Sequence, residues 1–156
     1  MLNIKFYDTV DDALLKFAVI ISQSDGKWVL CKHKERDTYE VPGGHREAGE
    51  DILETAKREL QEETGAVKFD IEPVCVYSVT GKNSLNETGE ETYGLLCFAE
   101  IMEFSGELEC EIEKVELMDE LPENWTYPLI QPKLMEEWRR RQAWRDIDSN
   151  KEWKII

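Results

Sequence analysis

The sequence predicts a small, acidic α/β domain that spans residues 1–156. Short apolar segments of strand length recur along the chain, and two longer segments have the composition or spacing of helices. Hydrophobic residues make up 41% of the chain and aromatic residues 10%, which is typical of a folded protein and not of a disordered one. A chain of 156 residues suits one domain with a full core, and the sequence contains no internal repeat, low-complexity segment or second domain.

The first part of the chain predicts a β-hairpin that leads into a glycine loop. In order, it predicts a polar lead-in at residues 1–12, a buried strand at Leu15–Ile21, a turn at Ser22–Gly26, a paired strand at Trp28–Lys32 and a charged loop at Lys34–Asp37. The next residues, YEVPGG, form a short apolar segment that ends in Pro-Gly-Gly. Paired glycines let a backbone approach a ligand closely, although an ordinary turn is the alternative for this tripeptide alone.

The segment Ile52–Thr64 predicts a helix, because it contains no Pro or Gly and is rich in Glu, Leu, Ala, Lys and Arg. Gly65 suits the left-handed position that ends a helix, and Glu50 and Asp51 lie where acidic residues favour the helix dipole. Apolar side chains on one side of this helix are expected to pack on the core: Ile52, Leu53, Ala56 and Leu60.

The second part of the chain predicts further strands and a closing helix. We expect strand structure over Val67–Thr80 with a break near Pro73, a polar, mobile loop at Gly81–Glu90, and strands at Tyr93–Ile101 and Leu108–Leu117. The last of these alternates apolar residues with glutamates, as a half-exposed strand does. The closing helix is expected at Pro128–Trp144, with Leu134, Met135 and Trp138 inward and Arg139 to Arg141 outward.

The predicted central helix carries a cluster of acids. Glu59, Glu62 and Glu63 are spaced so that their carboxylates share one helix face, where like charges repel. Runs of charge are ordinarily solvated surfaces, but a bound cation would relieve this repulsion, and Mg²⁺ prefers oxygen ligands. Arg58 could pair with Glu50 or a neighbouring carboxylate and fix its orientation through its planar fork.

Residues 44–66, GHREAGEDILETAKRELQEETGA, closely resemble the Nudix box, with Ala66 at a closing position that is larger in the usual pattern. The stretches HKERDTYEVPGGHRE and ELPEN make the chain look most similar to MutT-type members of the family. The resemblance implies an α/β/α sandwich with a central mixed sheet between helices. It also implies Mg²⁺-dependent or Mn²⁺-dependent hydrolysis of a nucleoside diphosphate linked to another group.

The resemblance also implies roles for individual residues. The metal ligands would be Glu59, Glu62, Glu63 and the backbone carbonyl of Gly43, and Glu50 and Arg58 would complete the catalytic set. The base varies within the family, so a box glutamate or an acid from a later segment could serve. The later candidates are Glu111, Glu113 and Glu116, for which the alternative is the solvent-facing side of a strand.

Candidate substrate-binding residues lie on both sides of the box: His33, Arg36, Tyr39, His45 and Trp125. Trp125 and the neighbouring Tyr127 could stack on a base, since every base offers a π-face. The alternatives are ordinary loop and strand roles for the first three, a solvated loop for His45, and packing against the closing helix for Trp125 and Tyr127.

The net charge of −15 argues against binding of polymeric nucleic acid, which needs clustered Lys and Arg. The start MLNIKFYD does not resemble a signal peptide, the four cysteines have no zinc-site spacing, and no apolar stretch is long enough to cross a membrane. We therefore expect a cytoplasmic monomer or homodimer with reduced thiols. Its partner would be a small nucleotide.

By resemblance, the leading function is hydrolysis of a nucleoside triphosphate, 8-oxo-purine forms included, to a monophosphate and pyrophosphate. Nucleotide sugars and dinucleoside polyphosphates remain alternative substrates, because specificity comes from loops that the box does not define. A non-catalytic nucleotide-binding module is a further alternative, although the intact set of acids argues against it.

Overall fold

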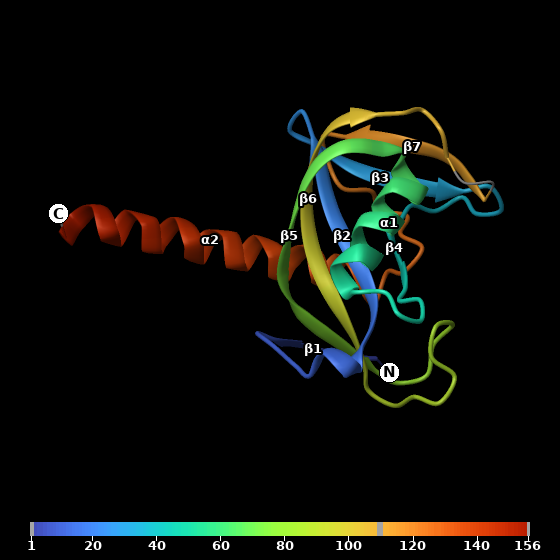
Figure 1. Ribbon diagram of the computed structural model, residues 1–156, viewed down its shortest axis with the longest axis horizontal. Coiled ribbons are helices and arrows are strands. Elements are labelled where there is room, and N and C mark those ends of the chain that lie inside the picture. The colour runs from blue at the N-terminus through green and yellow to red at the C-terminus, as the bar shows by residue number, and fades with distance from the viewer. Residues whose placement is uncertain (1, 109–110, 156) are drawn as a thin grey trace.

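Seven strands form one mixed sheet, in the order β1-β5-β6-β2-β3-β7, with β4 paired to β2 (Figure 1). The computed structural model describes residues 2–108 and 111–155, with side chains as far as residue 145. The central strands β2 and β6 run parallel, and the other pairs are antiparallel. The strands are β1 (Asn3–Tyr7), β2 (Leu15–Ser24), β3 (Lys27–His33), β4 (Gly43–His45), β5 (Ala66–Thr80), β6 (Thr92–Phe104) and β7 (Ile112–Met118).

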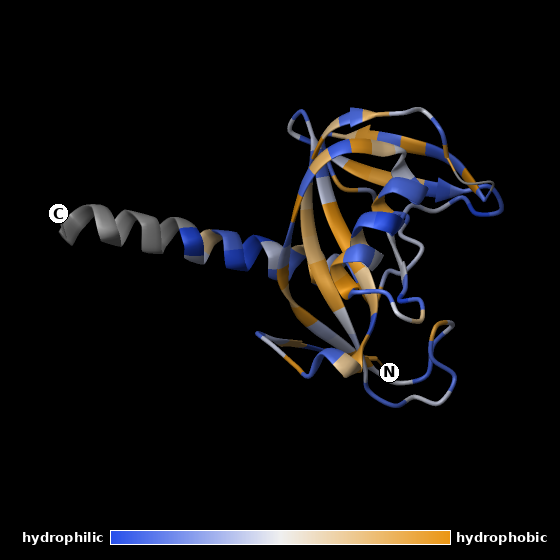
Figure 2. Ribbon diagram, in the orientation of Figure 1, coloured by the Kyte–Doolittle hydropathy of each residue, from blue (hydrophilic) through white to orange (hydrophobic). Residues whose placement is uncertain are grey.

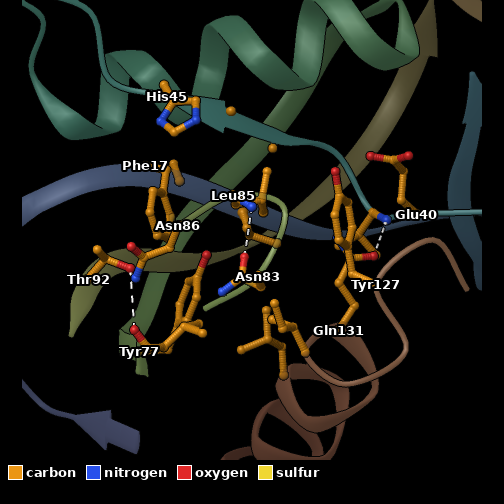
Figure 3. Close-up of a pocket in the computed structure, with 18 of the residues that line it drawn as sticks. Phe17, Glu40, His45, Tyr77, Asn83, Leu85, Asn86, Thr92, Tyr127 and Gln131 are labelled. Atoms are coloured by element: carbon orange, nitrogen blue, oxygen red, sulfur yellow. Dashed lines mark hydrogen bonds between the residues drawn. The ribbon is translucent and has the colours of Figure 1, made fainter. Parts of the chain in front are cut away.

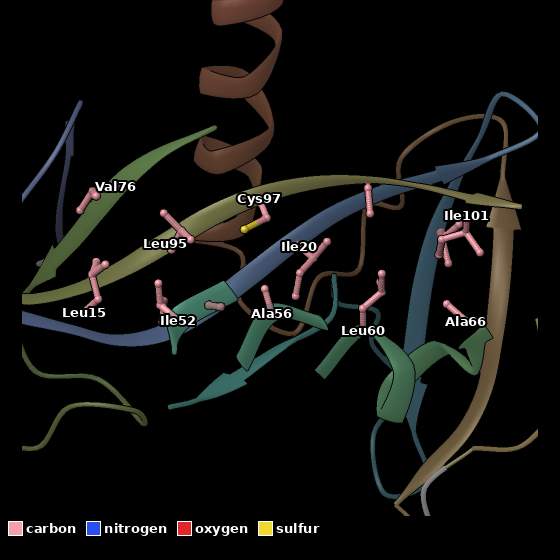
Figure 4. Packing of buried hydrophobic residues seen from close by; sticks show 13 residues of the cluster. Leu15, Ile20, Ile52, Ala56, Leu60, Ala66, Val76, Leu95, Cys97 and Ile101 are labelled. Atoms are coloured by element: carbon pink, nitrogen blue, oxygen red, sulfur yellow. The ribbon is translucent and has the colours of Figure 1, made fainter. Parts of the chain in front are cut away.

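Helices α1 (Ile52–Thr64) and α2 (Gln131–Ile155) cover opposite faces of this sheet. Ile52, Ala56 and Leu60 of α1 pack on one face against side chains such as Ile20 and Ile101 (Figure 4). On the other face, Leu134 and Met135 at the start of α2 join a second buried cluster that includes Ile21, Leu30 and Leu96. The fold is thus the expected α/β/α sandwich, and the inward positions predicted for Leu134 and Met135 are confirmed.

Apolar residues concentrate on the central strands, whereas α2 is mostly hydrophilic between the sheet and residue 145 (Figure 2). This distribution follows from burial, because the central strands are covered on both faces and alternate little along their length. No described helix is long and apolar enough to cross a membrane. The cysteines that the structure describes, Cys31, Cys75 and Cys97, are buried free thiols, and Cys110 lies outside the described residues.

Helix α1 has the bounds predicted from its composition. Its N-cap is Asp51, whose side chain accepts a hydrogen bond from the Leu53 backbone N–H at 3.1 Å. Gly65 ends it with a left-handed φ of 76°. The predicted hairpin is also confirmed, but its turn is shorter than the predicted Ser22–Gly26, because β2 continues to Ser24. Asp25 and Gly26 join β2 to β3, both with positive φ, as a two-residue hairpin turn requires.

Several sequence predictions are wrong in their boundaries. Residues 1–12 are not merely a lead-in, because β1 pairs with β5 and packs Ile4 and Phe6 on the second cluster. Segment β5 is continuous, and Pro73 coincides with a register shift against β6 instead of a break. The last strand begins at Ile112, four positions after the predicted Leu108, while residues 109–110 lie outside the described part.

The closing helix was predicted to begin at Pro128, but α2 begins at Gln131 and continues beyond Trp144 to Ile155. A turn precedes it, in which the backbone N–H of Ile130 donates to the Tyr127 carbonyl at 3.2 Å. Pro128 therefore lies in this turn. Trp138 is partly buried and stacks on Phe98 with ring centroids 4.8 Å apart, which agrees with its predicted inward position.

Candidate functional site

The glycine pair of the sequence motif forms the short strand β4, held between β2 and the start of the acid cluster on α1. A Cβ atom on Gly43 would lie 2.8 Å from the Ala18 carbonyl oxygen, and one on Gly44 would overlap the Glu59 carboxylate. A side chain on Gly43 would meet the backbone of β2, whereas one on Gly44 would displace the end of the Glu59 side chain. The two glycines therefore let β4 lie close to β2 and to Glu59 of α1.

Arg58 is the hub of the acid cluster. Its guanidinium binds Glu50 in a bidentate pair, Nε to Oε2 at 2.7 Å and Nη2 to Oε1 at 3.0 Å. Nη1 also donates to Glu59 at 2.8 Å and to Glu62 at 3.2 Å, and Nη2 reaches the His45 carbonyl at 3.0 Å. The predicted contact of Arg58 with Glu50 is therefore present, and one cation gathers three carboxylates.

These contacts set the protonation of the cluster. Hydrogen bonds from Arg58 and Thr55 lower the pKa of Glu50 to about 2, so this carboxylate is ionised at neutral pH. Burial raises the pKa of Glu59, while its hydrogen bond to Arg58 opposes that effect. The hydrogen bond to Glu50 in turn raises the pKa of Arg58, which stays charged.

Glu63 faces β4 and not Arg58. It is 7% exposed, and its Oε1 accepts a hydrogen bond from the Gly43 backbone N–H at 2.7 Å. Its other oxygen lies 3.6 Å from His33 Nε2, which is also 3.6 Å from Glu40 Oε1. Arg36 donates to Glu40 at 3.2 Å, so charged groups continue from the helix towards the loop after β3.

An apolar pocket of about 230 Å³ opens beside Gly43, Gly44 and Glu63 (Figure 3). Its walls come from elements that are far apart in the sequence, namely β2, β5, the loop after β5 and the start of α2. Apolar and aromatic side chains dominate the lining: Phe17, Val41, Tyr77, Leu85, Ile130 and Leu134. A pocket of this kind, with a few polar groups and a carboxylate cluster at one end, suits a nucleotide whose base is buried and whose phosphates reach the acids.

Comparison with known proteins settles the family. The NUDIX domain family model matches residues 14–138. The chain belongs to the Nudix family.

Similar Nudix proteins are known in bacteria. Over 70 residues the chain is 40% identical to YtkD of Bacillus subtilis (strain 168), a protein provisionally named an 8-oxo-dGTP diphosphatase. That match covers 45% of this chain and 44% of YtkD, so it spans less than half of either protein. The crystal structure of the Bacillus subtilis pyrophosphohydrolase BsRppH, solved as a mutant, superimposes with a TM-score of 0.71 and 26% identity, covering 89% of this chain and 90% of that one.

The Nudix domain of Shewanella oneidensis NrtR, solved with ADP ribose, is a more distant neighbour. It has a TM-score of 0.58 and 20% identity, and the match covers 82% of this chain and 88% of that one. At this identity the likeness concerns the fold. Together these comparisons confirm the family and the sandwich architecture expected from the sequence.

The structure brings some of the predicted substrate residues to the Nudix pocket and not others. His33, Arg36 and His45 line it, and His45 makes an edge-on contact with the Phe17 ring at 5.9 Å between centroids. Tyr39 and Trp125 are not among its lining residues. They pair with each other in an isolated β-bridge and pack on the second cluster, so the packing alternative describes them better. Tyr127, by contrast, lines the pocket.

The candidate general-base residues outside the Nudix box are not among the residues that line the pocket. Glu113 is paired with Lys32 at 2.7 Å, and Glu116 with Lys114 at 2.9 Å, and neither residue lines the pocket. Glu111 is exposed, and its backbone carbonyl accepts from Lys34. The described geometry therefore favours the solvent-facing alternative for these three residues.

The sequence did not identify Phe17, Tyr77, Leu85 or Gln131 as pocket residues. Phe17 and Tyr77 look like ordinary strand positions, and their rings come within 5.8 Å because β2 and β5 both pair with β6. Leu85 was a possible signal, because it is a single apolar residue in an otherwise polar loop, GKNSLNETGE.

The acid cluster has the donor chemistry for a hard divalent cation. Among the described residues no group of three or more His, Cys, Asp or Glu side chains is placed to hold a metal ion, because Arg58 draws Glu50, Glu59 and Glu62 to itself. Nevertheless Glu59, Glu62 and Glu63 supply carboxylate oxygens close to Gly43 and Gly44 of β4. Open sites of this kind suit Mg²⁺, which takes few protein carboxylates and completes its shell with water and phosphate oxygens.

Proposed function

We propose that the chain is a metal-dependent hydrolase that converts a nucleoside triphosphate to a nucleoside monophosphate and pyrophosphate. The observation that carries this proposal is the juxtaposition of two features at β4. On one side of Gly43 and Gly44 lies the carboxylate cluster of α1, and on the other lies the apolar pocket. A nucleotide with its base in the pocket would place its phosphates beside the acids.

Glu59, Glu62, Glu63 and the Gly43 carbonyl would hold Mg²⁺ or Mn²⁺, which when bound would neutralise charge on the phosphates and lower the pKa of an attacking water. Arg58 keeps the carboxylates of Glu50 and Glu59 in fixed orientations through its hydrogen bonds. The Gly43 backbone N–H does the same for Glu63. These carboxylates are thus oriented before a substrate arrives, which reduces the reorganisation needed during the reaction.

In the proposed reaction, the water oxygen forms a bond to phosphorus and the bond from that phosphorus to the bridging oxygen breaks. The electron pair leaves with pyrophosphate, and a carboxylate of the Nudix box accepts the proton of the water. The box is the better source of this base, because Glu63 lines the pocket, whereas Glu113 and Glu116 do not. The apolar walls hold the nucleoside.

The provisional name of the YtkD relative supports a nucleoside triphosphate as substrate, with 8-oxo-dGTP included in the panel to be tested. The test is a screen of nucleoside triphosphates, a nucleotide sugar and a dinucleoside polyphosphate with Mg²⁺ or Mn²⁺, in which pyrophosphate and orthophosphate are measured separately. We expect pyrophosphate from triphosphates, and its loss in excess chelator. Hydrolysis confined to the nucleotide sugar or the dinucleoside compound would overturn the substrate class, and no hydrolysis with either metal would overturn the activity.

A further inference from the structure

The loop between β5 and β6, Gly81–Glu90, forms one wall of the pocket, to which it contributes Leu85 and Asn86 (Figure 3). Among the described residues, the hydrogen bonds of this loop run only between its own members. For example, the backbone N–H of Gly81 donates to the Gly89 carbonyl at 2.9 Å, and that of Gly89 donates to Asn86 Oδ1 at 3.3 Å. The loop therefore holds its own shape, and its position at the pocket depends on how its two ends are attached to the sheet.

Glu91, the residue between this loop and β6, attaches one of those ends. Its carboxylate accepts hydrogen bonds from hydroxyl groups on three strands. Oε2 accepts from Tyr7 of β1 at 2.7 Å and from Ser78 of β5 at 2.6 Å, and Oε1 accepts from Tyr93 of β6 at 2.8 Å. Hydrogen bonds to an ionised carboxylate are stronger than those between neutral groups. Glu91 thus ties the end of the loop to three strands at once.

This group of four side chains lies outside the pocket, because none of the four is among the lining residues. Tyr77 and Val79 do line the pocket, and successive side chains of a strand point to opposite faces of a sheet. Ser78, between them, therefore points away from the pocket, and the Glu91 carboxylate that it contacts lies on the same far side. Any effect of Glu91 on a bound nucleoside must pass through the loop.

We propose that Glu91 is a positioning residue, which keeps Leu85 and the rest of the Gly81–Glu90 loop against the pocket and so tightens nucleoside binding. Leu85 is 52% exposed, so its own packing does little to hold the loop in place. Once the loop is released, only the fraction of molecules that have it in position binds at full affinity. This inference rests on the proposed function, since it concerns the nucleoside pocket of the same site.

The test compares Glu91→Ala with Glu90→Ala, which makes the same chemical change one residue earlier. Glu90 is exposed, and only its backbone groups hydrogen-bond to described residues. For Glu91→Ala we expect KM for a nucleoside triphosphate to rise by about 10-fold while kcat stays within about twofold, because the carboxylates around Arg58 are not altered. Glu90→Ala should leave both constants unchanged.

Two milder variants distinguish positioning from a general loss of stability. Glu91→Gln has the same size and keeps one oxygen as an acceptor, so its KM should lie between those of the wild-type protein and Glu91→Ala. Tyr7→Phe removes a single hydroxyl group from β1 and should also raise KM, by less than Glu91→Ala does. An unfolded fraction lowers kcat but leaves KM unchanged, because the folded molecules still bind normally. Thermal melts identify the variants that are folded at the assay temperature, and Tyr7→Phe carries the test if Glu91→Ala is not.

Two measurements without turnover keep this inference separate from the proposed function. Hydrogen exchange of the backbone amides in residues 81–90 should be faster in Glu91→Ala than in the wild-type protein, with the amides of α1 unchanged. Calorimetry with ATP, GTP, CTP and UTP in excess chelator should show about 10-fold weaker binding of each nucleotide that the wild-type protein binds. These two results would support the role of Glu91 even if no nucleotide were hydrolysed.

The inference is overturned if the wild-type protein binds none of the four nucleotides, or if Glu91→Ala binds them as tightly as the wild-type protein does. Equal exchange of the loop amides in the two proteins would also overturn it, as would the same rise in KM in Glu90→Ala. Hydrolysis with an unchanged KM in Glu91→Ala would remove this inference and leave the proposed function in place.

Discussion

The substitution Arg58→Lys tests whether the guanidinium holds the Nudix carboxylates in place. Arg58 donates five hydrogen bonds through three nitrogens, four to the carboxylates of Glu50, Glu59 and Glu62 and one to the His45 carbonyl. A lysine ammonium has one nitrogen with three protons, so at least two of the five are lost, and the bidentate pair with Glu50 cannot form. The positive charge remains, which makes this a test of geometry more than of charge.

We expect kcat/KM for a nucleoside triphosphate to fall by about 10- to 100-fold, because residues that orient metal-binding carboxylates contribute this much to metal affinity or activity. The Mg²⁺ concentration that gives half-maximal rate should rise as well. The assay is steady-state pyrophosphate release at several Mg²⁺ concentrations, together with a thermal melt that confirms a folded variant.

Arg46 provides a matched control. It also makes several hydrogen bonds near the site, but to the backbone carbonyls of Glu50, Asp12 and Leu15 and to the Asp12 side chain, and to no carboxylate of the box helix. Arg46→Lys makes the same chemical change without disturbing the cluster. If both variants turn over like the wild-type protein at every Mg²⁺ concentration, the orienting role of Arg58 is refuted.

Four further predictions follow from other parts of the site. Glu63→Gln or Glu62→Gln should lower kcat by about 100-fold or more, measured as pyrophosphate release, and a normal rate would contradict their assignment as ligands. Gly44→Ala should lower kcat by about 10-fold or more in a folded protein, because the new Cβ would displace the Glu59 carboxylate; unchanged turnover would argue against a role for that carboxylate's position. Three hydroxyl groups, foremost that of Ser78, lower the pKa of Glu91 to about 2, so its ionised form stabilises the folded state fully above pH 4.5. The difference in Tm between the wild-type protein and Glu91→Gln should therefore shrink as pH falls from 4.5 towards 2, and a constant difference would argue against this linkage. Finally, kcat/KM should be higher for a nucleoside triphosphate than for a 5′-triphosphorylated oligonucleotide at equal salt. The chain carries a net charge of −15, and a polymer adds phosphates near this acidic surface. The reverse preference would overturn this expectation.

The structure strengthens the reason for that last expectation. The two basic segments that could have contacted a polymer are Lys32–Arg36 and Arg139–Arg141. Lys32 is paired with Glu113, and Arg140 and Arg141 are both paired with Glu137. Arg139 lies over the Trp28 ring at 5.7 Å. These side chains neutralise acids or cover an aromatic ring of the same chain, and so add little attraction for phosphates elsewhere.

The acid cluster could be predicted from the sequence because its geometry is local. A helix of uninterrupted helix-forming residues has a fixed period, so the relative positions of Glu59, Glu62 and Glu63 follow once the helix is assigned. The contact between Arg58 and Glu50 spans only the first two turns and the preceding loop, and the Asp51 cap defines where those turns begin. These local contacts were therefore enough to predict the acid cluster from the sequence.

The pocket could not be predicted in the same way, because its walls meet only through the topology of the sheet. Phe17 and Tyr77 are 60 positions apart, and their rings come within 5.8 Å because β6 lies between β2 and β5. Tyr39 and Trp125 have the composition expected of a base-stacking site, yet they bridge to each other and pack on the core. Residue type alone does not separate a ligand-facing aromatic ring from a packed one.

The residues proposed for catalysis make local contacts, whereas the residues proposed for substrate specificity are brought together only by the tertiary fold. The groups proposed to act on the diphosphate belong to one helix and the loop before it, so changes elsewhere can leave them intact. The groups that line the pocket, where the base is proposed to bind, come from β2, the loop after β5 and the start of α2. Gln131 connects the two parts, because its amide oxygen holds the backbone of Val41, two residues before Gly43.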